Sequence, residues 1–220
     1  TNDSTKLKQH ESGGITIDAT GAENHCTILA ITPSTLQKGL LWVTTDDGKV
    51  HLSKNGGTTW EDLTANVSGL PKGSWIPQVK ASVHNVGEAV IVVNNYRNFD
   101  FNTYLFRTKD FGKTWTSLAS NSKVSGYSLS FIQDLVEPKL MFLGTEFGLY
   151  VSIDEGNVWT KWTNGYPTVS TMDLTIQPRE HDLVIGTFGR AAYVLDDIRP
   201  LRALAKEGVD VLDKTLKIYE

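Results

Sequence analysis

Short runs in which apolar and polar residues alternate recur along most of the chain. Alternation with a period of two and a high content of β-branched residues are typical of strands with one face on a core. Turn-forming sequences such as Asp47-Gly48, Asn55-Gly56 and Asn164-Gly165 separate the runs. The pattern therefore predicts many short antiparallel strands joined by tight turns.

The predicted strands fall into four successive groups. They are 27–31, 39–44, 49–52 and 59–63; then 76–83, 88–93, 103–107 and 114–118; then 127–132, 139–143, 148–151 and 158–162; then 171–176, 182–185 and 191–195, with no clear last strand. Four short strands in roughly 45 residues is the spacing of a propeller blade. We expect an all-β chain, a partial β-propeller of about four blades at 24–70, 71–122, 123–166 and 167–200.

Both ends of the chain differ from the repeated middle. Residues 1–23 are expected to form an N-terminal tail, with a possible edge strand at 14–18. Residues 201–220 form a C-terminal extension, in which 201–207 is compatible with a helix and 209–212 and 215–219 are candidate strands. The chain begins at Thr1 without a charged and then apolar leader, which suggests a processed product or a piece of a longer protein.

Three tryptophans end the same eight-residue pattern, Ser/Thr-x-Asp/Asn-x-Gly-x-Thr/Val-Trp. The three octets span residues 53–60, 108–115 and 152–159. Their key positions are Ser53, Asn55, Gly57 and Trp60; Thr108, Asp110, Gly112 and Trp115; and Ser152, Asp154, Gly156 and Trp159. A fourth copy decays, because Tyr193-Val194-Leu195-Asp196-Asp197 echoes the start of the third unit without its glycine and tryptophan.

Each octet is expected to be a structural turn between two strands. The carboxylate or amide at the third position accepts bonds from backbone N–H groups, and the glycine supplies a positive φ. The hydroxyl at the first position bonds across the turn, and the tryptophan packs on the sheet. These residues are therefore predicted to hold the fold rather than to bind a ligand.

The octet resembles the Asp-box, also called the bacterial neuraminidase repeat (BNR). The segment 183–201, with Gly186-Thr187-Phe188-Gly189-Arg190 and Leu195-Asp196-Asp197, is similar to the last blade of secreted bacterial propeller proteins labelled BNR-repeat glycosyl hydrolases or sortilin-like proteins. The resemblance, over about 11–201, implies a larger propeller of which this chain is the C-terminal part. It also implies a secreted, periplasmic or cell-surface location, and remaining blades or another protein chain on the open flanks.

In propellers of this type the octets lie on one face, and a ligand site is expected on the opposite one. That face holds the loops between second and third strands and the entries to each blade. Aromatic rings beside polar groups there suit a glycan or an extended peptide. The predicted ligand-binding residues are His25, Trp75, Tyr96, Arg97, Tyr127, Phe147 and Arg190.

A glycosidase would need two carboxyl groups on the same face, about 5–10 Å apart. The candidate catalytic residues are Asp46, Asp47, Asp100, Glu146 and Asp173. None carries a local motif that separates it from an acid in an ordinary turn, and Asp47-Gly48 is typical of a hairpin. A sialidase would also need an arginine cluster, whereas only Arg97 and Arg190 are expected on this face.

Composition narrows the remaining functions. The chain has 21 Lys and Arg against 25 Asp and Glu, for a net charge of −4, so nucleic acid is not an expected partner. No apolar run approaches the roughly 18 residues of a membrane span. The single cysteine, Cys26, and five histidines without ligand spacing predict neither a disulfide nor a metal site. The glycines belong to turns, and no cofactor is expected.

Three hypotheses follow. The first is a binding or scaffold module that holds a protein, peptide or glycan on the loop face. The second is a BNR-type glycoside hydrolase whose carboxylates are shared with blades outside this chain. The third is a structural scaffold in a larger assembly, which would cover the open flanks because unpaired apolar sheet surface promotes aggregation.

Overall fold

The structure is a computed structural model that describes residues 27–213, and it consists of four antiparallel sheets. Blade 1 contains β1 (Ile28–Pro33), β2 (Leu41–Thr45), β3 (Val50–Ser53) and β4 (Glu61–Asp62). Blade 2 contains β5 (Trp75–Ala81), β6 (Ala89–Asn95), β7 (Asp100–Thr108) and β8 (Thr116–Ala119). Blade 3 contains β9 (Ser128–Gln133), β10 (Met141–Thr145), β11 (Gly148–Ser152) and β12 (Thr160–Lys161). Blade 4 has three strands, β13 (Thr171–Gln177), β14 (Asp182–Thr187) and β15 (Ala192–Leu195).

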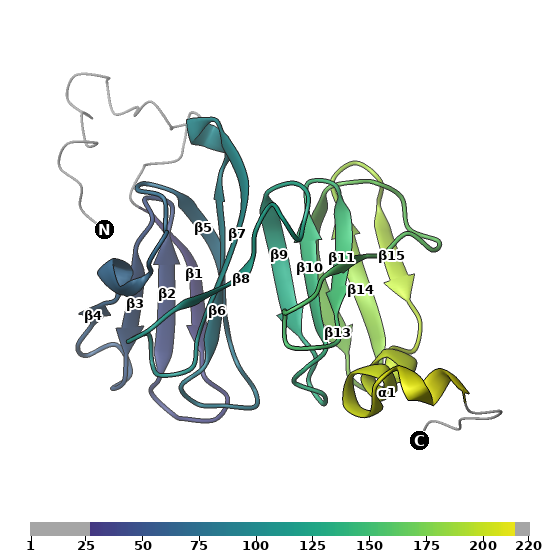
Figure 1. Cartoon of the computed structure of the whole chain (residues 1–220). Helices are drawn as coiled ribbons and strands as arrows, with labels where there is room; N and C mark the ends of the chain where they lie inside the picture. The colour runs from purple at the N-terminus through teal and green to yellow at the C-terminus, as the bar shows by residue number, and fades with distance from the viewer. Residues whose placement is uncertain (1–26, 214–220) are drawn as a thin grey trace.

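The sheets stand side by side in chain order, from blade 1 at the left of Figure 1 to blade 4 at the right. In every sheet the strands are ordered as they follow in the chain. The first strands of neighbouring sheets contact each other, β1 with β5, β5 with β9 and β9 with β13. The predicted all-β partial propeller is therefore confirmed, and within residues 27–213 the fourth blade has three strands.

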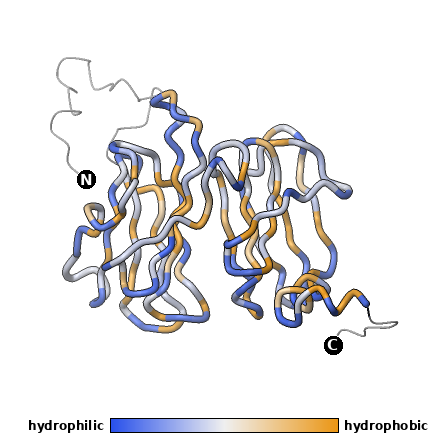
Figure 2. The backbone as a smooth tube through the Cα atoms, in the orientation of Figure 1, coloured by the Kyte–Doolittle hydropathy of each residue, from blue (hydrophilic) through white to orange (hydrophobic). Residues whose placement is uncertain are grey.

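Three apolar cores lie between the blades, one at each junction. The core between blades 1 and 2 contains Trp42, Leu52 and Ile91, and the next core contains Val92 and Phe131. The third core joins blade 3 to blade 4. Figure 2 shows the apolar residues concentrated in the strands. Blades 2 and 3 therefore have a neighbour on both faces, which explains the continuous apolar run of a central strand such as β6, buried along its whole length.

The three octets join the third strand of a blade to its fourth and share one hydrogen-bond pattern. The amides of Gly57, Gly112 and Gly156 donate to the hydroxyl of the first octet residue at 2.8, 2.9 and 2.9 Å. The amides of Thr59, Thr114 and Val158 donate to the third-position side chain, each at 2.9 Å. The three glycines have φ of 90, 80 and 84°, a conformation that favours glycine.

The tryptophan of the second and third octets packs its blade against the preceding blade. The ring of Trp115 meets Trp42 of blade 1 edge-on, with the centroids 6.1 Å apart. The indole N–H of Trp159 donates to the carbonyl of Leu118 in blade 2 at 3.0 Å. The last strands β4 and β12 are shorter than the predicted 59–63 and 158–162. The reason is that the first residues of each predicted strand belong to the octet turn.

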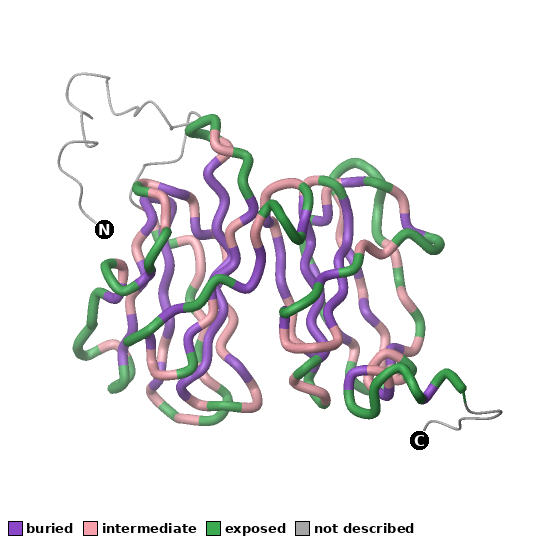
Figure 3. The backbone as a smooth tube through the Cα atoms, in the orientation of Figure 1, coloured by how far each residue is buried: buried purple, intermediate pink, exposed green. Residues whose placement is uncertain are grey.

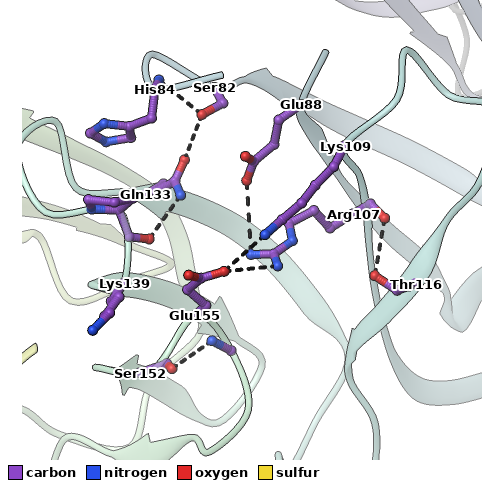
Figure 4. A network of polar contacts seen from close by, with 12 residues as sticks. Ser82, His84, Glu88, Arg107, Lys109, Thr116, Gln133, Lys139, Ser152 and Glu155 are labelled. Carbon is purple, nitrogen blue, oxygen red and sulfur yellow. Dashed lines mark hydrogen bonds and ion pairs between the residues drawn. The ribbon is translucent and has the colours of Figure 1, made fainter. Parts of the chain in front are cut away.

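Charged groups add to the junction between blades 2 and 3 (Figure 4). The guanidinium of Arg107 lies 3.2 Å from the carboxylate of Glu155 and 3.9 Å from that of Glu88. Lys109 also pairs with Glu155, at 3.1 Å. The hydrogen bond from the Lys109 ammonium holds the pKa of Glu155 below its usual value. Burial acts in the opposite direction, and the charge of Arg107 adds to the lowering. The third octet is thus tied to blade 2 by charge as well as by its tryptophan.

The C-terminal segment after blade 4 is helical. Helix α1 (Arg199–Glu207) has Pro200 in its first turn, where the fixed φ of proline suits a helix. Arg202 on α1 binds Asp134 of blade 3 through two hydrogen bonds of 2.8 Å. The prediction of a strand at 209–212 is wrong, because these residues form the 3₁₀ helix η4 (Val209–Asp213). The candidate strands 14–18 and 215–219, with His25 and Cys26, lie outside the described residues.

Candidate functional site

The antiparallel order of the strands gives the molecule two distinct ends. The loops after β2, β6, β10 and β14 lie at the same end as the entries to each blade, and the octets and α1 lie at the other. In three blades, the first amide after the second strand donates to the carbonyl just before the first strand. The pairs are Asp46 with Thr27 (3.1 Å), Glu146 with Tyr127 (3.1 Å) and Phe188 with Ser170 (2.9 Å). We call this end the loop face.

The loop between β6 and β7 in blade 2 carries an arginine that stacks on two aromatic rings. It contains the short 3₁₀ helix η3 (Tyr96–Asn98) and projects at the upper end in Figure 1. The guanidinium carbon of Arg97 lies 3.8 Å from the ring centre of Trp75 and 4.6 Å from that of Tyr96. These are stacking distances, at which the ring faces attract the cation and fix its orientation.

The rings continue onto the entry of blade 3. Tyr127 lies 4.8 Å from Tyr96 and 6.4 Å from Phe101, measured between ring centres. Burial raises the pKa of the Tyr127 phenol, and the nearby carboxylate of Glu146 raises it further. We refer to Trp75, Tyr96, Arg97, Phe101 and Tyr127 as the aromatic cluster.

Hydrogen bonds fix the loop that carries the aromatic cluster. The Asp100 carboxylate accepts bonds from the side-chain NH₂ group of Asn95 at 3.0 Å and from the phenol of Tyr104 at 2.9 Å. Although burial acts in the other direction, these donors and Asn102 lower the pKa of the Asp100 carboxyl group. Asn98 donates to the side-chain oxygen of Asn95 at 2.7 Å. The cluster is therefore carried by an ordered loop, which reduces the entropy lost on binding.

A groove with a volume of about 920 Å³ lies on the blade 1 side of the same loop. It runs between the start of β3, with the turn before it, and the segment that connects blade 1 to blade 2, and Asn98 also lines it. Its charged lining residues are Asp47, Lys49, Asp62 and Lys72, beside His51. The volume falls in the range of typical ligand pockets, about 300–1,000 Å³.

Exposed phenylalanines mark the loop face of blades 2, 3 and 4. Phe99, Phe147 and Phe188 follow β6, β10 and β14 respectively, and all three are solvent-exposed. Figure 3 shows the exposed tip of the blade 2 loop, which stands on buried strands. Exposed aromatic residues in the corresponding loops of neighbouring blades provide apolar contact points on the loop face.

The structure brings together four of the seven predicted ligand-binding residues. Arg97 contacts both Trp75 and Tyr96, and Tyr96 in turn contacts Tyr127. The ring of Phe147 lies beside Gly126, the residue before Tyr127. Arg190 is exposed in the loop of blade 4 and makes none of these contacts among the described residues. His25 lies outside the described residues.

Most of the candidate catalytic acids are engaged in their own turns. Asp46 is buried and accepts bonds from the amide and hydroxyl of Thr27 at 2.8 and 2.9 Å. Asp47 is buried and accepts from the hydroxyl of Thr45 at 2.5 Å, and Asp100 braces the blade 2 loop. Glu146 is half-buried beside the aromatic cluster, and Asp173 is exposed on β13. Three of the five acids are therefore held by hydrogen bonds to groups of their own blade.

Sequence reasoning missed the groove and the full extent of the ring contacts. One wall of the groove is formed by residues from 64–73, the segment that connects blade 1 to blade 2. In the sequence, Pro71-Lys72-Gly73 marks this segment only as a turn. The described residues contain neither a group of acids, histidines or cysteines that could hold a metal nor a helix suited to crossing a membrane.

Comparison with solved structures shows similarity to propeller proteins at low sequence identity. The GH74 enzyme of Niastella koreensis matches with a TM-score of 0.61 and 18% identity, over 77% of this chain and 28% of the enzyme. YCF48 bound to D1 peptide gives 0.56 and 17%, over 77% of this chain and 51% of that one. A chain of a nidogen/laminin complex gives 0.60 and 10%, over 79% and 61%.

These similarities define the class of protein, and the class is a β-propeller. The chain spans between 28% and 61% of the length of the three proteins named above. No protein-family model and no curated protein sequence matches the chain. The fold is thus common to hydrolases and to proteins that hold partners, so function has to be argued from the site.

Proposed function

We propose that this chain is a binding module that holds an extended peptide segment of a partner protein on the loop face. The observation that carries the proposal is the stacking of Arg97 on Trp75 and Tyr96, at 3.8 and 4.6 Å from their ring centres. Arg97 is exposed, so the stack fixes its plane while leaving its N–H edge to the solvent. A guanidinium held in this way favours a carboxylate or backbone carbonyl of a ligand.

The surroundings of Arg97 suit a chain longer than one residue. The rings of Phe101 and Tyr127 extend the surface onto blade 3, and the groove extends it toward blade 1. Aromatic side chains supply contact area at low entropic cost, and the groove supplies both charges and backbone groups. Among similar structures, YCF48 is bound to a D1 peptide, which supports a peptide as the ligand class.

The family assignment is part of the proposal. The shared hydrogen bonds of the three octets and their position between third and fourth strands support an Asp-box (BNR) propeller of the sortilin-like or glycosyl hydrolase type. A secreted, periplasmic or cell-surface location follows from that family alone. Within a larger assembly, the same chain would also act as a scaffold.

The geometry gives the hydrolase alternative little support. Asp46, Asp47 and Asp100 accept hydrogen bonds from neighbouring groups of their own blade. A general acid needs a raised pKa, whereas the pKa of Asp100 is lowered. The similarity to a GH74 enzyme concerns the fold, because the identity is 18%.

A displayed library of random peptides, selected on the full chain, tests the proposal. Affinities of the selected peptides are then measured for Arg97→Ala and Trp75→Ala, with Arg179→Ala as the matched control. Arg179 is an exposed arginine in the turn between β13 and β14, at the opposite end of the molecule. We expect a loss of about tenfold or more for the first two variants and no change for the control. Equal affinity of Arg97→Ala and the parent chain would overturn the proposal.

A further inference from the structure

Blade 1 exposes an apolar face on its outer side, away from blade 2. Ile28, Ile31 and Trp60 are 56, 60 and 46% exposed within the described part of the chain. With Leu41 and Val43 they line a hollow of about 480 Å³. Native monomers seldom leave such a cluster of large apolar side chains in contact with water.

Strand register shows what the same positions do in the other blades. Ile31 pairs with Val43 across β1 and β2, and the equivalent first-strand residues are Val79, Phe131 and Leu174. Those three residues are at most 2% exposed, because each lies against the preceding blade. The exposed face of blade 1 is therefore one side of a junction that the chain builds three times.

The octet tryptophans also indicate that blade 1 exposes one side of a blade junction, and they do so independently of the strand positions. Trp115 and Trp159 are 9 and 7% exposed, and each packs on the preceding blade. Trp60 occupies the same octet position in blade 1 and keeps 46% of its surface exposed. Among residues 27–213, no blade precedes Trp60 to cover its ring.

Blade 4 exposes the other side of the junction. Val194 pairs with Val184 across β14 and β15, as Leu52 pairs with Trp42 in blade 1 and Val151 with Phe142 in blade 3. The residues of blades 1 and 3 at these positions are buried against the next blade. Val194 is 54% exposed and Ala192 is also exposed.

We propose that the outer face of blade 1 docks on the outer face of blade 4 of a second copy of this chain. One chain carries both sides of the junction, at opposite ends of its row of blades. Two copies related by a twofold axis would make this contact twice, so that neither apolar face stays open. Two sets of four sheets give eight, within the range of about four to eight blades in propellers. The surface is separate from the loop face, so this inference goes beyond the proposed binding function.

Size-exclusion chromatography with light scattering on the full chain tests the inference. We expect a mass of twice 24.3 kDa at micromolar concentration. Ile31→Asp and Val194→Asp, each at an exposed position that tolerates a charge in the monomer, are expected to give folded monomers by circular dichroism. The matched control Ile31→Val leaves the dimer intact.

Mixing the two aspartate variants tests the head-to-tail geometry. The blade 4 face of the Ile31→Asp chain and the blade 1 face of the Val194→Asp chain are both unaltered, so the mixture is expected to form a dimer through one junction. A monomeric parent chain would overturn the proposal. In that case, quenching of tryptophan fluorescence by acrylamide shows whether Trp60 is open to solvent or covered by another part of the same chain, and either result leaves the proposal overturned. A dimer that survives both substitutions, or variants that do not pair on mixing, would also overturn it.

Discussion

Replacing an octet tryptophan by alanine should lower the unfolding free energy in proportion to the tryptophan surface that the preceding blade buries. Trp115 is 9% exposed, contacts Trp42 and donates its indole N–H to the carbonyl of Gly112 at 3.1 Å. Trp60 occupies the same position of its own octet with 46% of its surface exposed. The two residues therefore form a matched pair within one chain, because the local turn is the same and the neighbour differs.

The expected cost follows from the buried area. A buried tryptophan removes about 200 Å² from water, worth about 5 kcal/mol at about 25 cal/mol/Å². Measured losses for such substitutions are about 3–5 kcal/mol, and we expect that range for Trp115→Ala. Since Trp60 keeps nearly half of its surface exposed, Trp60→Ala should cost about 2 kcal/mol.

Urea denaturation followed by far-ultraviolet circular dichroism measures both losses. The protein concentration has to be low enough for light scattering to show monomers, so that association does not contribute to Trp60. Trp115→Ala should lower the urea concentration at the unfolding midpoint by about 2 M, at about 2 kcal/mol per M of urea. Equal losses for Trp60→Ala and Trp115→Ala would refute the view that the octet tryptophan stabilises the junction between blades.

Two further predictions concern charged groups. Arg202→Met leaves the buried carboxylate of Asp134 without its cation and should lower the unfolding free energy by about 3–5 kcal/mol. Arg199→Met breaks the half-exposed ion pair with Asp197 and should lower it by less than about 1 kcal/mol in the same denaturation assay. The pKa of Asp100 is lowered in the folded chain, so its carboxylate contributes stability above its unfolded pKa, and this contribution is lost as the pH falls through the folded value. The stability difference between the parent chain and Asp100→Asn should accordingly shrink between about pH 5 and about pH 2, and a difference that stays constant would contradict the assignment.

The sequence was sufficient for features that repeat or that depend on neighbours in the chain. The octets are visible because a hydroxyl, an acid or amide, a glycine and a tryptophan recur at fixed spacing, and the turn needs each of them. The absence of a clear last strand in the fourth group was likewise visible. The structure agrees, since blade 4 has three strands in the part of the chain that is described.

Features that depend on how blades and termini pack were not predictable. Trp75 and Arg97 lie on one blade, and their proximity follows from the pairing of β5 with β6. Tyr127 joins them only because blade 3 stands at a particular angle to blade 2. The bond between Arg202 and Asp134 spans 68 positions and depends on where α1 packs, so no local pattern marks it.

The central claim is that a peptide partner binds at the loop face, away from the octets. Hydrogen exchange of the full chain, with and without a peptide selected on it, measures this directly. We predict slower exchange in residues 94–102 and 126–128, and unchanged exchange in the octets 53–60 and 152–159. Protection centred on the octets, or on the outer face of blade 1, would contradict the account.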